Sequence, residues 1–203
     1  MAPPSIAIVG AGISGLTLAL QLHMKGFRDV TVFESSRELK PLGVGLNLQP
    51  SAVLVLRNLG LLPELERIAI SCRELLFFDQ HGNGILREAR GLAAGYEIPQ
   101  LSIHRGQLQM LLLRTVRQRL SDDAVMQSHM LRSLVQEGNA VTAQFATSRG
   151  EVTNVKADAL IAADGINSTV RATMYPDEGP PKYSGRILWR GCYEGLPFLT
   201  GAR

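Results

Sequence analysis

The chain has 203 residues, of which 45% are hydrophobic and 19% are charged, and its formal net charge is +3. This composition is typical of a folded globular protein and excludes an intrinsically disordered chain. Because the lysines and arginines form no basic run with interleaved aromatic residues, we expect no nucleic-acid partner.

The cysteines and histidines form no pattern typical of a metal site or a disulfide framework. Cys72 and Cys192 stand far apart, and the four histidines are dispersed. A reduced chain in the cytoplasm, without a bound metal, is therefore expected. Residues 5–22 carry no charge, but glycines interrupt this stretch and no basic segment precedes it, so we predict neither a signal peptide nor a membrane span.

The first predicted elements form a βαβ unit around the glycine loop GAGISG. A buried strand at residues 5–9 precedes the loop, helical spacing follows at 14–25, and a second strand, DVTVFE, ends at Glu34. Such a loop lets a pyrophosphate approach the backbone at the positive end of the helix, and an acidic residue in this position accepts hydrogen bonds from a ribose diol. Arg37 follows closely, and its positive charge means that a ribose carrying a 2′-phosphate is not excluded. The unit predicts an ADP-containing dinucleotide, either NAD or FAD, with a glycine-rich turn that binds nothing as the alternative.

The next part of the chain departs from a simple alternation of strands and helices. Gly43 and Gly45 mark a loop that either passes near a ligand or simply connects two elements, and a helix is predicted from Pro50. Two strands at residues 74–79 and 85–88, joined by the turn QHGNG, predict an antiparallel excursion from the nucleotide-binding core.

A long amphipathic helix is predicted from Arg105 to residue 120, after an apolar segment at residues 98–103. A positive charge at a helix N-terminus is unfavourable, so Arg105 is either solvated or offset by a bound anion. The segment AVMQSH, residues 124–129, predicts another parallel strand. A hairpin that turns at Gly138 follows it.

The last predicted strand, residues 158–163, leads into Asp164-Gly165 and a helix that Asn167 or Ser168 can cap. Asp164 is not expected to lie directly against a pyrophosphate, because like charges repel. Asp164 is instead expected to act through its backbone, through a water molecule or through a hydroxyl partner.

Taken together, VGAGISGLTLAL, FESS, PLGVGLNLQP, SIHRGQLQMLL, LIAADGINSTVRA and WRG occur in the order and spacing of FAD-dependent aromatic-ring monooxygenases of the para-hydroxybenzoate and salicylate hydroxylase class. The chain resembles this family over nearly its whole length, and the phenazine-modifying flavin monooxygenases look most similar. The resemblance implies FAD, NAD(P)H as a transient reductant, and hydroxylation of a small aromatic substrate with O₂ through a flavin C4a-hydroperoxide. It also implies an α/β fold: a Rossmann-like FAD-binding domain of the GxGxxG type with antiparallel β excursions, truncated before the substrate domain is complete.

The same resemblance implies roles for single residues. Arg190, in LWRG, is the candidate for a catalytic contact with substrate or flavin. His129, expected at the end of its strand, would meet the adenine through its backbone. The implied FAD contacts are Gly10, Gly12, Ser14 and Gly15 at the pyrophosphate, Glu34 and Ser35 at the adenosine ribose, Gly43, Val44 and Gly45 along the flavin, and Arg105, His129 and Asp164.

The resemblance also sets an expected domain organisation. It consists of a FAD-binding βαβ part at residues 1–72, an antiparallel excursion toward the substrate domain at 73–103, the rest of the FAD-binding domain at 104–176, and the start of the substrate domain at 177–203. Because family members continue with a second Gly-Asp motif and most of the substrate-binding sheet, we expect exposed apolar surface here, a partner that covers it or low stability, and no turnover by this chain alone. The alternatives are a non-catalytic FAD- or dinucleotide-binding fragment and an NAD-dependent dehydrogenase.

Overall fold

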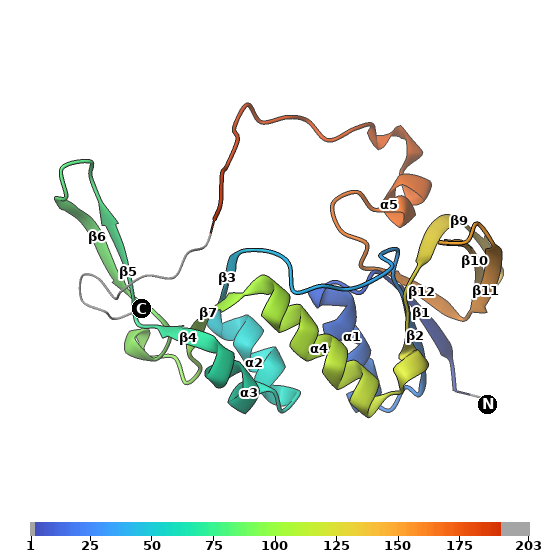
Figure 1. Cartoon of the computed structure of the whole chain (residues 1–203), viewed down its shortest axis with the longest axis horizontal. Helices are drawn as coiled ribbons and strands as arrows, with labels where there is room; N and C mark the ends of the chain where they lie inside the picture. Colours follow the sequence, from blue (N-terminus) through green and yellow to red (C-terminus); the bar gives the residue numbers. More distant parts are fainter. Residues whose placement is uncertain (1–2, 192–203) are drawn as a thin grey trace. The chain divides into compact units, whose positions relative to one another are not determined.

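The computed structural model describes residues 3–191, and the chain divides into two compact units. The first unit comprises Met1–Lys40 and Gln109–Ile187, and the second comprises Pro41–Leu108 and Leu188–Arg203. Figure 1 labels most of the helices and strands of both units.

The first unit is built on a parallel sheet with the strand order β12-β1-β2-β8. Its short, β-branched runs are those of strands buried on both faces. Helix α1 packs against β1 and β2, as expected of a βαβ unit. The bounds are β1 Ser5–Val9, α1 Ile13–Met24, β2 Asp29–Phe33, β8 Val125–Met126 and β12 Ala159–Ala162.

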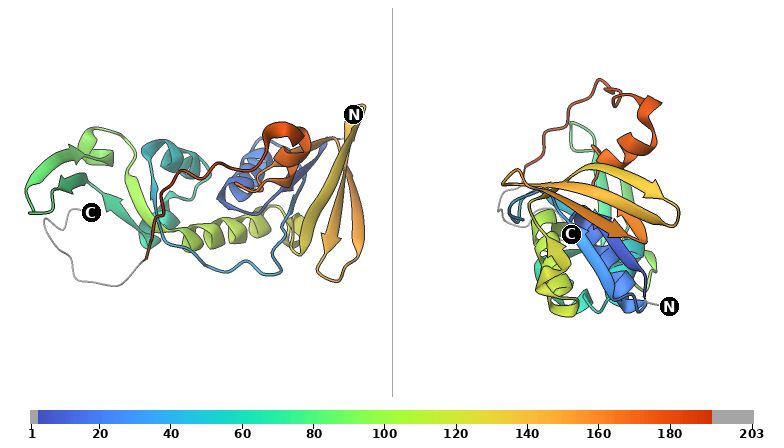
Figure 2. Two further views of the ribbon diagram at one scale, coloured as in Figure 1. Left: turned by 90° about the horizontal axis from the view of Figure 1, so that it is seen from above. Right: turned by 90° about the vertical axis from the view of Figure 1, so that its right-hand side faces the viewer.

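A second, antiparallel sheet with the order β11-β10-β9 covers one face of the parallel sheet (Figure 2). The alternation along β1 directs Ala7 and Val9 toward this layer, where they share a core with Phe145. Phe145 is fully buried, and its ring stacks on that of Phe33 with 4.4 Å between the ring centroids. The bounds are β9 His129–Glu137, β10 Ala140–Thr147 and β11 Val152–Ala157.

Two further helices contribute to the first unit. Helix α4, Arg105–Arg119, runs from the second unit into the first, and its buried face carries the leucines and valine expected from the helical period. Helix α5, Thr169–Met174, packs against β9. Short 3₁₀ turns lie at Asp122–Ala124 and Pro176–Glu178.

The second unit contains an antiparallel sheet of order β3-β7-β4 and a separate two-stranded hairpin, β5-β6. Helix α2 packs against β3 and β7, and α3 packs against α2 and β4. The bounds are β3 Gly45–Leu48, α2 Pro50–Asn58, α3 Leu62–Ile68, β4 Ala69–Cys72, β5 Glu74–Phe78, β6 Gly84–Ala89 and β7 Gln100–His104, with a 3₁₀ turn at Gly91–Ala94.

The fold class expected from the sequence is confirmed: a Rossmann-like α/β core carries antiparallel excursions. One expectation was wrong in its boundaries. The segment AVMQSH is not one strand, because β8 ends at Met126 and His129 begins the antiparallel β9 rather than ending a parallel strand. The break lies at Ser128, whose φ of 60° is left-handed and turns the chain out of the parallel sheet.

Within residues 3–191, no helix is long and apolar enough to cross a membrane. The same residues contain no group of three or more His, Cys, Asp or Glu side chains that could hold a metal ion.

Candidate functional site

The candidate residues of the first unit meet at the carboxyl edge of the parallel sheet. Strands β1, β2 and β12 all end there, and the chain leaving them is tied together by two backbone hydrogen bonds. The Gly10 N–H donates to the Phe33 carbonyl at 2.7 Å, and the Ala163 N–H donates to the Val9 carbonyl at 2.8 Å. Ligands of open α/β sheets bind at this edge.

Two glycines of the loop are required by the fold itself. Gly10 has a φ of 104°, and a Cβ there would lie 2.8 Å from the carbonyl carbon of Ala163. A Cβ on Gly15 would collide with the carbonyl oxygen of Gly10. Both positions therefore serve the close packing of the turn, with or without a ligand.

Gly12 differs from its two neighbours. A Cβ on this residue would meet nothing within 4 Å, so its missing side chain leaves open space beside the loop. Gly12 is also the N-cap of α1, and it caps the helix with no side-chain hydrogen bond. The first turn of α1 therefore presents backbone N–H groups and a positive dipole end next to an open space, which is the arrangement that binds phosphate.

Glu34 lies directly after β2 with only 9% of its surface exposed. Its Oε2 accepts a hydrogen bond from the Ala11 N–H at 2.8 Å, and its Oε1 accepts from the Ser36 N–H at 2.7 Å and from the Ser35 hydroxyl at 3.2 Å. Burial alone would raise the pKa of Glu34, but the hydrogen bonds from Ser36 and Ala11 outweigh it and hold the pKa below its ordinary value. The carboxylate is therefore ionised at neutral pH, and Oε2 has a lone pair left to accept from a hydroxyl.

His129 and Asp164 flank this edge of the sheet. The His129 N–H donates to the Glu34 carbonyl at 2.8 Å, and its ring Nδ1 lies 2.7 Å from the Gln127 carbonyl. Asp164 accepts from the Ser168 hydroxyl at 2.6 Å, which is the kind of hydroxyl partner that the sequence suggested. Ser168 is the N-cap of α5, so the Asp164 carboxylate fixes the start of that helix.

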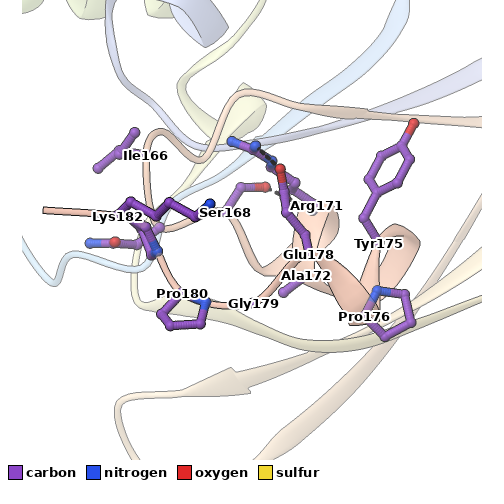
Figure 3. Close-up of a pocket in the computed structure, with 12 residues that line it drawn as sticks. Ile166, Ser168, Arg171, Ala172, Tyr175, Pro176, Glu178, Gly179, Pro180 and Lys182 are labelled. Carbon is purple, nitrogen blue, oxygen red and sulfur yellow. Dashed lines mark hydrogen bonds and ion pairs between the residues drawn. The ribbon is translucent and has the colours of Figure 1, made fainter. Parts of the chain in front are cut away.

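A cavity of about 660 Å³ lies beside α5 and the segment that follows it (Figure 3). Arg171 and Glu178, both labelled in Figure 3, form an ion pair on its wall, so the charge of this arginine is balanced within the chain. Lys182 contributes a second cation.

The candidate residues of the second unit cluster around the start of α4 and the start of β3. The Arg105 N–H donates to the Val44 carbonyl at 3.0 Å. Gly43 has a φ of 129°, and a Cβ there would lie 3.3 Å from the Arg105 Cβ. The Arg190 guanidinium donates through Nη2 to the Gly45 carbonyl at 3.0 Å.

The structure thus places the sequence-selected residues in two groups, one in each unit. It also shows a residue that the sequence reasoning missed: the side chain of Gln109 donates to the carbonyl of Ala11 at 2.9 Å. The signal was present in the sequence, because Gln109 is a polar residue on the inward face of a helix whose other inward positions are mostly apolar.

Comparisons with known proteins agree with this geometry. Residues 4–183 match the family described as FAD binding domain. The phenazine 1,6-dicarboxylic acid hydroxylase PhzS of Lysobacter antibioticus is 44% identical over 198 residues, which are 97% of this chain and 49% of that protein. The salicylate hydroxylase of Pseudomonas putida is 29% identical, over 94% of this chain and 44% of that protein. The chain therefore spans about half the length of these curated relatives.

Among solved structures, the p-nitrophenol 4-monooxygenase PnpA from Pseudomonas putida DLL-E4 is similar with a TM-score of 0.75 and 24% identity. The match covers 85% of this chain and 43% of that chain, and at this identity it establishes the fold.

Proposed function

The chain belongs to the FAD binding domain family, and from this premise we propose that it is the FAD-binding portion of a flavoprotein monooxygenase. The whole protein would hydroxylate a small aromatic substrate with NAD(P)H and O₂. The relatives support this reaction class, since proteins named as phenazine and salicylate hydroxylases align with 94% or more of the chain.

The observation that carries the proposal is the open space at Gly12 in front of the uncapped N-terminus of α1. A dinucleotide pyrophosphate would fill this space and accept hydrogen bonds from the first-turn N–H groups. Gly10 and Gly15 would shape the turn, and the Ser14 hydroxyl would add a donor at the helix start. The residues present therefore fit the pyrophosphate of FAD.

Glu34 would hold the adenosine ribose. Its carboxylate is ionised and buried, with a lone pair free on Oε2 for a ribose hydroxyl. Ser35 would assist from beside it. The backbone of His129, which already bonds to Glu34, would border the adenine, and Asp164 would act through its backbone while its side chain holds Ser168.

The residues of the second unit would take the flavin part of the cofactor. In this proposal the Gly43–Val44–Gly45 backbone would lie along the flavin, and Arg105 would contact FAD. Arg190 would contact substrate or flavin. Bound FAD would supply the redox chemistry of the reaction, while the residues of this chain bind the cofactor and orient it.

A non-catalytic FAD-binding fragment is the second candidate, because the glycine loop and Glu34 would serve cofactor binding with or without turnover. In either case a partner would find apolar surface on the β5-β6 hairpin, where Phe77, Ile85 and Leu86 are about half exposed or more. A cytoplasmic location is part of the same proposal and rests on the cysteine pattern of the sequence.

The test is the visible spectrum of the purified chain, titrated with FAD and separately with NAD. We expect a bound flavin spectrum and quenched flavin fluorescence with FAD. Binding of NAD without binding of FAD would contradict the proposal. If FAD binds, NAD(P)H-dependent O₂ consumption with an aromatic substrate separates a working hydroxylase from a non-catalytic fragment.

A further inference from the structure

Ala11 lies in the middle of the glycine loop, between Gly10 and Gly12, and its backbone N–H and carbonyl are both held by buried side chains. Its N–H donates to Glu34 Oε2 at 2.8 Å. Its carbonyl accepts from Gln109 Nε2 at 2.9 Å. Ala11 itself is fully buried, so water does not replace either partner without opening the loop.

We propose that Gln109 is a positioning residue for the cofactor: its amide fixes the peptide plane between Ala11 and Gly12, and thereby aims the N-terminus of α1 at the pyrophosphate. This inference rests on the proposed function, because it assigns the loop to FAD.

The position of Gln109 makes this role specific. The residue lies on α4, almost 100 positions along the chain from the loop, and only 8% of its surface is exposed. It stands among leucines, where an apolar side chain would satisfy packing equally well. A buried amide at such a site costs desolvation free energy unless its hydrogen bonds are made. Gln109 therefore supplies a hydrogen-bond donor to the Ala11 carbonyl, which a leucine at this position would lack.

The consequence for binding follows from the turn geometry. The Ala11 carbonyl shares a peptide plane with the N–H of Gly12, the N-cap of α1, so a rotation of this plane changes the direction in which the Gly12 N–H points at the start of the helix. A loop held at both polar atoms is preorganised for the anion, and preorganisation lowers the ordering cost of binding. Without Gln109 the carbonyl loses its donor, and the loop samples other conformations.

The first experiment compares Gln109→Met with Gln118→Met in the 203-residue chain. Methionine keeps the length of glutamine and removes the donor, and Gln118 is an exposed glutamine on the same helix. We expect Gln109→Met to weaken FAD about tenfold, the range for a buried carbonyl that loses its partner, and to weaken ADP by a similar factor. Gln118→Met should match the wild type. Equal FAD affinity of Gln109→Met and wild type overturns the inference and leaves the proposed function intact.

A second variant separates positioning from simple core packing. Glutamate is isosteric with glutamine, but it donates to the Ala11 carbonyl only when protonated. The FAD affinity of Gln109→Glu, divided by the wild-type affinity at the same pH, should fall as pH rises through the pKa of the new carboxyl, while the ratio for Gln109→Met stays flat. Taking the ratio removes the titration of Glu34, which accepts from the N–H of the same residue, Ala11. A flat ratio for both variants contradicts a hydrogen-bonding role.

A readout without cofactor makes the inference independent of FAD binding. In the ligand-free chain, amide hydrogen exchange at residues 10–15 should be faster in Gln109→Met than in the wild type and unchanged in Gln118→Met. Unchanged exchange in Gln109→Met overturns the inference, whatever FAD does. If the wild type does not bind FAD but loop exchange is still faster in Gln109→Met, the proposed function is contradicted and the role of Gln109 in the loop is not.

Discussion

The three glycines of GAGISG separate at the residue scale into two kinds. Gly10 and Gly15 are in contact with backbone atoms that leave no room for a Cβ, whereas Gly12 faces open space. Sequence reasoning gave all three a part in one motif. The motif itself predicts this division, with Gly10 for the turn, Gly12 for the approach of the pyrophosphate and Gly15 for helix packing, and the coordinates agree with it.

Gly12→Val tests that distinction. Because the Cβ position is open and the φ of Gly12 is −71°, the substitution should leave the free energy of unfolding nearly unchanged. It should nevertheless abolish measurable FAD binding, because the branched side chain occupies the space for the pyrophosphate. Flavin fluorescence and thermal unfolding measure the two effects. Gly84→Val, at an open position in β6, is the control, and unchanged FAD affinity of Gly12→Val would show that the site is misplaced.

Glu34→Gln tests the electrostatics of the same edge. The pKa of Glu34 in the folded chain lies below its ordinary value of 4.5, so its stabilising contribution is fully present above that value and is lost as pH falls through the folded pKa. We expect Glu34→Gln to lower the free energy of unfolding by about 1–3 kcal/mol at neutral pH, because the three donors to Glu34 lose a charged acceptor and the amide NH2 accepts none of them.

The difference between wild type and Glu34→Gln should shrink as pH falls below 4.5, which urea unfolding from pH 7 to pH 3 measures. Glu38→Gln, at a largely exposed glutamate, is the control and should show little of this acid dependence. A difference that is constant across the whole range would mean that the hydrogen bonds to Ser36 and Ala11 do not act on the charged form.

At the scale of elements, local sequence patterns predicted most of the structure. The strand at Ser5–Val9, the start of α4 at Arg105 and the hairpin turn at Gly138 all lie where residue type and period place them. Strands β3, β4 and β11 and helix α3 were not predicted. Their segments are short, and they depend on pairing with distant partners, such as β3 and β4 on β7, which no local period records.

The candidate site was predictable only in part for the same reason. The glycine loop and Glu34 lie within one βαβ unit, so their proximity follows from local order. Gln109 reaches Ala11 from almost 100 residues away, and Arg190 reaches Gly45 from still farther. Such contacts are set by tertiary packing, and the sequence offers only the anomaly of a polar residue on an apolar helix face.

Gly106→Ala tests the close approach at the start of α4. On helix propensity alone, alanine would stabilise the helix by about 1 kcal/mol. A Cβ at this position would lie 2.6 Å from the Cα of Pro41, which is backbone and has little freedom to move. We therefore expect the opposite sign, a loss of about 1–3 kcal/mol in the free energy of unfolding. Urea denaturation of this variant beside Gly84→Ala measures it, and any stabilisation by Gly106→Ala would refute the packing.

At the scale of the whole molecule, the described chain ends in a stretch that differs from both compact units. Residues 180–191 form no helix or strand and are exposed throughout. All of the proposed FAD contacts of the first unit, including Gly12, Glu34 and Asp164, precede this stretch. We therefore expect the first unit to bind the cofactor whether or not residues 180–191 are intact.

Limited proteolysis tests this separation. Trypsin should cut first after Lys182 or Arg186, because exposed segments without regular hydrogen bonding fit a protease site most readily. Mass spectrometry of early time points identifies the cut, and gel filtration with added FAD then asks whether the large product keeps the cofactor. We expect it to do so, because the glycine loop and its two anchoring side chains remain. A first cut within α4 would contradict the structure, whereas loss of FAD after cleavage at Arg186 would assign the Arg190 segment a direct share in holding the cofactor.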